Sequence, residues 1–248
     1  MPNKKLSKKI FITGKIRTLT GLHIGGTNNS VDIGNVDAYV IRDAYSGKPY
    51  IPGSSLRGKL RSLLEQVLGI YNSNANMGKV KNGPSIDGKT ITVKLFGAIK
   101  SESEGGNIPS KILVRDCPLL SEYRDNPNLP QYTEIKTEVV IDRLTSEAMP
   151  RSLERVPAGV EFDLQIVLNV WEEDKEDDML QHLFMAMLLL QDDYLGGKGS
   201  RGCGQIEIGI GNIEARDAAF YRNVGNIDND AKQQTNHIIP EKLRLWED

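Results

Sequence analysis

One segment, GSSLRGKLRSLL, combines two serines with three cations near its start. Ser54 and Ser55 are good helix N-caps, but Arg57, Lys59 and Arg61 then occupy the first two turns, where the helix dipole favours acids. Arg57 and Arg61 also repel each other at i, i+4 spacing, at a cost of about 0.2–0.5 kcal/mol. A bound phosphate would reverse both penalties, because backbone N–H groups, hydroxyls and guanidinium groups all bind anions. The segment therefore predicts a phosphate site, with a solvated basic face as the alternative.

A second segment, LGGKGSRGCG, is rich in glycine and contains no acid. Five of the nine residues from Gly196 to Gly204 are glycine, which lets a ligand approach the backbone closely, and Lys198 and Arg201 supply positive charge. The run matches neither the P-loop nor the GxGxxG signature, because it precedes a predicted strand and does not open a helix. It argues against a nucleotide cofactor and favours a groove that follows the backbone of a long polyanion.

The third segment, GLHIGGTNNSVDIGNVD, contains a histidine and two aspartates in a polar, glycine-containing stretch. His23 follows the first predicted strand, and Asp32 and Asp37 follow in the loop. A lone histidine is more often a hydrogen-bonded structural residue, and a loop aspartate more often forms a turn or cap. Phosphodiester cleavage nevertheless needs a base or a metal-holding carboxylate, which the other two segments do not supply.

The charge is unevenly distributed along the chain. The net charge is −2, from 31 basic and 33 acidic residues, yet residues 172–178, EEDKEDD, contribute −5 of it. The first 30 residues contain no acid. A basic face for an anionic polymer can therefore exist beside an acidic one, although such charge runs are also typical of ordinary solvated surface.

Composition excludes several classes of protein. With 39% hydrophobic and 26% charged residues among 248, the chain is typical of a globular protein with its own core. Cys117 and Cys203 lie far apart without a CxxC partner, which argues against a disulfide framework or a common zinc site. No stretch has the length and apolarity of a secretory signal or a membrane span, so we expect a cytoplasmic protein with no membrane partner.

Hydrophobic periodicity predicts alternating strands and helices. Leucines at helical spacing predict an amphipathic helix that starts after Gly53 and ends at Gly69, and unbroken alternation from Val160 to Val170 predicts a strand. Further elements are expected at Lys9–Leu19 (strand), Val40–Ile51 (hairpin turning at Ser46 and Gly47), Ile91–Phe96 and Lys111–Asp116 (short strands), Asp178–Leu190 (helix) and Gln205–Ile210 (strand).

This order predicts a single α+β domain over residues 1–248. Strand, helix, strand, strand, helix, strand is the ferredoxin-like arrangement, an antiparallel sheet with two helices on one face. Long insertions are expected at about 70–108, as a loop or lid, and at about 118–158, where the β-branched run 137–141 predicts a projecting hairpin. Residues 214–248 are weakly patterned and are expected to form a peripheral helix or tail.

Taken together and in order, the motifs resemble a known family. The runs GLHIGG, IGNVD, VIRD, GKPYIPGSSLRGKLRSLLE, IDRLTSEAMPR, LERV and DDYLGGKGSRGCG are similar to those of the RAMP backbone subunits of type III-A CRISPR effectors, the Csm complexes. The resemblance implies an RRM-like, ferredoxin-type core with a thumb-like hairpin. It also implies copies stacked along a guide RNA (crRNA) among other Csm subunits, each cleaving the single-stranded target RNA paired to that guide.

The resemblance also implies roles for individual residues. Asp37, which ends the IGNVD run, matches the family's position for target cleavage and for holding a divalent metal, whereas Asp32 receives no role. Glu138 and the other thumb carboxylates rank below Asp37. The residues implied to contact RNA are His23, Ser54, Ser55, Arg57, Lys59, Arg61, Arg143, Gly197, Lys198, Ser200 and Arg201.

The implied chemistry uses the 2′-hydroxyl of the target RNA as its nucleophile. The thumb would flip one nucleotide and align this hydroxyl with the adjacent phosphorus. An ordinary aspartate, with a pKa of ~3.9, is a weak base at neutral pH, so Asp37 is better suited to hold Mg²⁺ or Mn²⁺. Two alternatives stay open: a scaffold that binds guide RNA without cutting, and a nuclease that trims precursor guide RNA with His23 as base. No cluster of residues indicates a metabolic enzyme.

Overall fold

The computed structural model describes residues 5–26, 38–73, 82–101, 106–120, 132–222, 233–234 and 237–246. Its centre is a five-stranded sheet in the order β11-β10-β1-β9-β5, with every neighbouring pair antiparallel. Alternate residues of β1, including Ile10, Ile12 and Ile16, are fully buried, as expected for a sheet with one covered face. The strands are β1 (Leu6–Thr18), β5 (Ile112–Val114), β9 (Glu161–Trp171), β10 (Ile206–Asp217) and β11 (Gln233–Gln234).

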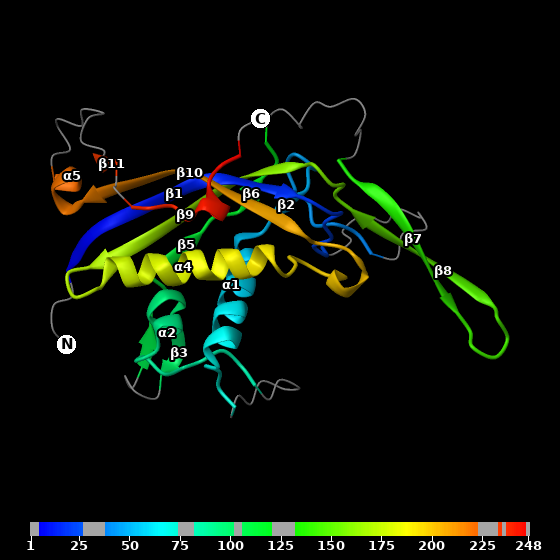
Figure 1. Cartoon of the computed structure of the whole chain (residues 1–248), viewed down its shortest axis with the longest axis horizontal. Helices are drawn as coiled ribbons and strands as arrows, with labels where there is room; N and C mark the ends of the chain where they lie inside the picture. The colour runs from blue at the N-terminus through cyan, green and yellow to red at the C-terminus, as the bar shows by residue number, and fades with distance from the viewer. Residues whose placement is uncertain are drawn as a thin grey trace.

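Two long helices cover one face of this sheet (Figure 1). Helix α1 (Gly53–Leu68) buries Leu56, Leu60 and Leu64, which share one stripe at i, i+4 spacing. Helix α4 (Glu176–Gln191) carries three acids in its first turn, the sign that the helix dipole favours there. The core elements follow one another as β1, α1, β5, β9, α4 and β10. The predicted ferredoxin-like arrangement is therefore confirmed.

The first insertion contains structure that the sequence did not predict. Ile91–Phe96 forms a helix, α2, and not the strand that we expected. The Thr90 hydroxyl caps it by accepting the N–H of Val93, and the helix ends at Gly97, whose φ is 75°. A run of six residues is too short for apolar spacing to distinguish a strand from a helix. The cap from Thr90 favours the helix. Strands β3 (Ala98–Ser101) and β4 (Gly106–Ile108) follow as an antiparallel pair.

The expected hairpin over Val40–Ile51 is only partly formed. The chain turns between Asp43 and Lys48, where the Asp43 N–H donates to the Lys48 carbonyl oxygen over 2.9 Å. The Asp43 carboxylate accepts both the N–H and the hydroxyl of Ser46, at 2.7 Å each. The only strand in this part, β2 (Tyr50–Ile51), pairs with β6 (Cys117–Pro118). The predicted turn is confirmed, but the strand that follows it, β2, pairs with β6, which is distant in sequence.

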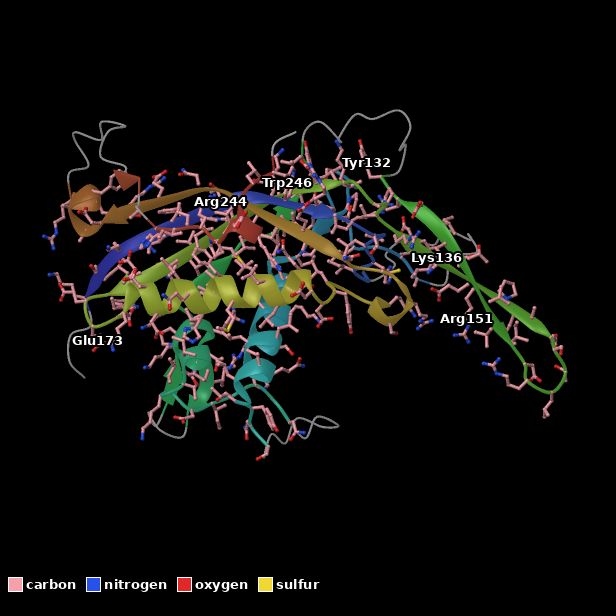
Figure 2. The ribbon with its side chains drawn as sticks, viewed as in Figure 1. Tyr132, Lys136, Arg151, Glu173, Arg244 and Trp246 are labelled. Atoms are coloured by element: carbon pink, nitrogen blue, oxygen red, sulfur yellow. The ribbon has the colours of Figure 1, made fainter. Side chains whose placement is uncertain are left out.

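The second insertion forms a hairpin that projects from the body, as predicted (Figure 1). Strands β7 (Glu134–Ile141) and β8 (Ala148–Arg155) pair over their full lengths. At the tip, the Asp142 carboxylate accepts the N–H groups of Leu144 and Thr145, each at 2.8 Å. Figure 2 labels Lys136 and Arg151 along this hairpin. We refer to β7, β8 and their turn as the thumb.

The C-terminal part is less peripheral than predicted. Strand β10 extends to Asp217 and runs into the short helix α5 (Ala218–Arg222). A single 3-10 turn, η3 (Glu241–Leu243), places Leu243 fully in the core. The Trp246 indole, labelled in Figure 2, donates to the Glu161 carboxylate over 3.0 Å. Within the described ranges, no helix is both long enough and apolar enough to cross a membrane.

Candidate nucleic-acid interface

The structure brings the two glycine-rich segments together. The Gly197 N–H donates to the His23 carbonyl oxygen over 2.8 Å, and the Gly204 N–H donates to the Gly21 carbonyl oxygen over 3.0 Å. Gly196 has a φ of 78°, and a side chain there would strike the His23 carbonyl. Glycine is required at this position both for its backbone conformation and for the close approach. Segments from opposite ends of the sequence therefore form one surface.

His23 is held rigidly within this surface. Its side chain is largely buried, with the residue 7% exposed, and its Nδ1 lies 2.7 Å from the backbone carbonyl oxygen of Glu154. A carbonyl oxygen can only accept, so Nδ1 donates in this contact. The histidine thus joins the loop after β1 to the base of the thumb, where β8 ends.

The glycine loop, residues 196–204, presents its polar groups on the surface. Lys198 adopts the left-handed conformation with φ 64°, an unfavourable geometry for a residue with a side chain. A 3-10 turn, η1 (Gly199–Arg201), follows. Ser200 and Arg201 are exposed, and a hollow of about 530 Å³ lies beside the loop. Its lining includes Thr20, Asp193, Tyr194, Gly199, Ser200 and Cys203.

The thumb contacts this loop through charged groups. Arg201 donates to Glu138 Oε2 over 3.0 Å, and Lys136 Nζ donates to the Arg201 carbonyl oxygen over 3.0 Å. Arg155 donates to Glu134 over 2.7 Å and lies against Gly21. The glycine loop, the His23 loop and the thumb thus form a continuous surface.

Glu154 is an organising residue that the sequence did not indicate as functional. Its buried carboxylate accepts the Val40 N–H at 2.8 Å, the Thr133 hydroxyl at 2.7 Å and Arg42 at 2.5 Å. Burial raises the pKa of Glu154, but these three donors outweigh burial and hold the pKa below its usual range. The residue lies in the LERV run, but its partners come from distant segments, so only the fold reveals this role.

The start of α1 differs from the prediction. The N-cap is Pro52, which supplies no side-chain cap, and Ser54 and Ser55 lie inside the first turn. The predicted serine caps are therefore wrong. Instead, the Gly53 N–H donates to Asp116 Oδ1 over 2.7 Å. Because Asp116 follows β5, the sheet places a carboxylate at the positive end of this helix, where negative charge is favoured.

The cations of α1 face two different surroundings. Arg57 donates to the Phe96 carbonyl oxygen, and Arg61 donates to the carbonyl oxygens of Gly97 and Ser85 over 3.0 and 2.7 Å. Both guanidinium groups thus hold the end of α2. Lys59 pairs with Asp193 over 3.0 Å and lies 4.0 Å above the Tyr194 ring. Of the three, Lys59 is the one that contacts the segment leading into the glycine loop.

The remaining predicted residues lie at the thumb tip and in an undescribed segment. Arg143 is exposed in the turn between β7 and β8. Asp37 and Asp32 lie outside the described residues. Ala38, the next residue after Asp37, forms a parallel bridge with Leu153 of β8. Among the described residues, no three His, Cys, Asp or Glu side chains gather closely enough to hold a metal.

The fold and this interface place the chain in a defined class. Residues 15–207 match the model of the RAMP superfamily. A Methanocaldococcus jannaschii protein named CRISPR system Cms endoribonuclease Csm3 is 37% identical over 252 residues, covering 99% of this chain and 98% of that protein. A protein of the same name from Enterococcus italicus is 40% identical over 209 residues, covering 83% and 92%.

A solved structure agrees with these relatives. The Csm3-Csm4 subcomplex in the type III-A CRISPR-Cas interference complex contains a chain with a TM-score of 0.59 and 28% identity, covering 94% of this chain and 91% of that one. The chain therefore belongs to the RAMP superfamily and, within it, to the Csm3 family.

Proposed function

We propose that this chain is a backbone subunit of a cytoplasmic CRISPR effector, which binds guide RNA in a filament of copies and cleaves the paired target RNA at regular intervals. One observation carries the RNA-binding part most directly: the glycine loop, with Lys198 and Arg201, is joined to the His23 loop in a single surface. Glycines and cations on one surface suit a ribose-phosphate backbone. The names of the relatives support RNA cleavage.

The thumb suits the cleavage part of this proposal. It is a long, exposed hairpin fixed to the glycine loop through Glu138 and, at its base, to Val40 and Arg42 through Glu154. A wedge held in this way can unstack one nucleotide of a paired strand and so align its 2′-hydroxyl with the adjacent phosphorus. The 2′-oxygen attacks phosphorus as it loses its proton, the bond from phosphorus to the 5′-oxygen breaks, the 5′-oxygen takes up a proton, and a 2′,3′-cyclic phosphate forms.

Asp37 is proposed as the catalytic carboxylate and as the protein ligand of a divalent cation. Mg²⁺ at phosphoryl-transfer sites is usually held by one or two carboxylates together with substrate phosphates. One aspartate is therefore a sufficient protein contribution. When bound, Mg²⁺ or Mn²⁺ would neutralise charge that develops on the phosphate. The described residues contribute by binding and positioning the RNA.

Cleavage by an assembled effector tests the proposal. A labelled target RNA, paired to the guide, should yield a ladder of regularly spaced products with Mg²⁺ and none with EDTA. A 2′-deoxy substitution at one cut position should remove that product alone and leave the others. A complex that binds guide and target without cutting would instead support the non-catalytic scaffold. Products that retain the cut at the 2′-deoxy position would contradict attack by the 2′-hydroxyl.

A further inference from the structure

Arg201, a predicted RNA contact, is already paired with an anion from its own chain. Its guanidinium donates to Glu138 Oε2 over 3.0 Å. The Arg201 side chain is 56% exposed and the Glu138 side chain is 20% exposed. The pair therefore lies at the surface, where a polyanion could reach the arginine from solvent.

Lys136 completes the surroundings of this carboxylate. It lies two residues before Glu138, on the same face of β7, with its Nζ 3.3 Å from Glu138 Oε1. The same ammonium donates to the Arg201 carbonyl oxygen over 3.0 Å. Each carboxylate oxygen thus faces one cation. Two cations around one anion is also the arrangement that binds a phosphate with its two non-bridging oxygens.

The Glu138 carboxylate makes fewer hydrogen bonds than a charged group usually does. Glu138 Oε1 is buried and forms only the 3.3 Å ion pair with Lys136, with no well-directed hydrogen bond within the described part of the chain. Burial raises the pKa of Glu138, but the Lys136 ammonium and the Arg201 guanidinium outweigh burial and hold the pKa below its usual range. Glu138 is thus ionised at neutral pH. The Arg201 side chain of this pair is 56% exposed, so the pair lies at the surface, where ion pairs contribute little stability, and a phosphate can exchange with the carboxylate at low cost.

We propose that Glu138 occupies, in the RNA-free protein, the anion position that an RNA phosphate takes on Arg201 and Lys136. The thumb thereby masks the glycine loop from RNA until a guide displaces the carboxylate. The inference rests on the proposed function, because it requires that Arg201 contacts RNA. Glu138 then competes with RNA phosphates for Arg201 and Lys136, which lowers the affinity of the RNA-free protein for RNA other than the guide.

Displacement also changes the attachment of the thumb. Strand β7 contacts the glycine loop through Lys136 and through Glu138. When a phosphate replaces the carboxylate, one of these two contacts is lost. The Arg155 pair with Glu134 on the same hairpin does not involve Arg201 and persists. Binding of the guide therefore loosens one contact at the thumb base without detaching the hairpin.

Binding of a fluorescein-labelled oligouridylate to the full chain, followed by anisotropy over a range of salt, tests this competition. Glu138→Gln keeps the shape of the side chain and removes its charge. We expect it to tighten binding about two- to fivefold, the range for an exposed ion pair. We also expect it to steepen the slope of log K against log salt by up to about 0.7. Arg201→Ala should weaken binding, and the gain from Glu138→Gln should shrink in that background.

A matched control separates masking from net charge. Glu241→Gln removes one negative charge from the exposed turn η3, on another part of the molecule, and should leave binding unchanged. An equal gain from Glu241→Gln, or a full gain in the Arg201→Ala background, would overturn the proposal. If Glu138→Gln binds as the wild type does while Arg201→Ala binds more weakly, masking is wrong and the proposed function stands. If no variant binds RNA, both fail.

Discussion

The N–H of Gly197 donates to the carbonyl oxygen of His23 over 2.8 Å, which joins the loop after β1 to the loop before β10. Because β1 and β10 are adjacent antiparallel strands, these two loops meet at one end of the sheet. The thumb base approaches the same place through Glu154, whose carbonyl oxygen accepts from His23. The sheet thus positions three segments, distant in sequence, in one interface.

Because these loops pack closely, alanine substitutions at two of their glycines should lower the stability by different amounts. Gly196 and Gly202 both have left-handed φ values, 78° and 79°, but only Gly196 is packed against the His23 loop. Alanine at either position pays about 1–2 kcal/mol for its backbone conformation. Gly196→Ala should cost about 1–3 kcal/mol more because of the clash and should weaken RNA binding. Urea unfolding of both variants measures the difference, and equal losses would contradict the packing described.

Replacing Lys198 by glycine should raise the stability of the protein and weaken its binding of RNA. Its φ of 64° is strained for lysine and relaxed for glycine. Lys198→Gly should raise the free energy of unfolding by up to about 1 kcal/mol, because the relief of about 1–2 kcal/mol of backbone strain exceeds the entropy cost of about 0.5–1 kcal/mol for glycine. It should also flatten the salt slope of RNA binding by about 0.7. Urea unfolding and salt-dependent anisotropy report the two effects. Unchanged RNA binding would remove Lys198 from the interface.

Arg57 is predicted to contribute chiefly to stability. Its guanidinium donates to the Phe96 carbonyl oxygen and lies over the Phe96 ring. Arg57→Ala should therefore cost about 1.5–3 kcal/mol in urea unfolding. Lys59→Ala, which removes a partly exposed pair with Asp193, should cost less than about 1 kcal/mol. If Arg57→Ala kept full stability and lost RNA binding, the stabilising role would be contradicted and the phosphate site predicted from the sequence would be supported.

The ion pairs of Glu161 should make the free energy of unfolding depend on pH. Its side chain is 2% exposed and pairs with Lys15 at 3.0 Å and Arg17 at 2.5 Å. Burial raises the pKa of Glu161, but Lys15, Arg17 and Trp246 outweigh burial and lower it overall. A lowered folded pKa stabilises the protein above the unfolded value of about 4.3, and this stabilisation is lost as the pH falls through the folded pKa.

A neutral substitution should reveal this contribution. Glu161→Gln should cost about 1–3 kcal/mol at pH 7, and its difference from the wild type should shrink below about pH 4. Glu207→Gln is the matched control, because the Glu207 side chain is 41% exposed and lies 4.0 Å from Arg17; it should cost less than about 1 kcal/mol. Urea unfolding at several pH values measures both. A Glu161→Gln deficit of the same size at every pH would contradict the assignment.

The sequence predicted the parts of the fold that depend on local pattern. Alternation and leucine spacing identified β1, α1, β9, α4 and β10, because their apolar residues repeat over several periods. The strand predicted from Ile91 to Phe96 is wrong, since its six residues are compatible with either period and the capping role of Thr90 shows only in the structure.

The interface was harder to predict, because its hydrogen bonds join distant segments. Asp116 at the start of α1 and Glu154 at the thumb base act through partners from other strands and loops, which no local spacing shows. Arg57 and Arg61 have the spacing of a phosphate site, and the structure adds a role that this spacing did not indicate, since both hold the end of α2. In contrast, the glycine loop was predictable as a surface for close approach, since its glycines and cations lie within ten residues of sequence.

Cleavage of guide-paired target RNA by a complex that carries Asp37→Ala tests the central claim most directly. The account predicts that the regularly spaced products fall at least about 100-fold, while guide RNA still copurifies in wild-type amount, because the glycine loop and the thumb are unchanged. Undiminished cleavage at the same positions would contradict the role of Asp37. Loss of the guide together with cleavage would show that Asp37 supports assembly and not the reaction.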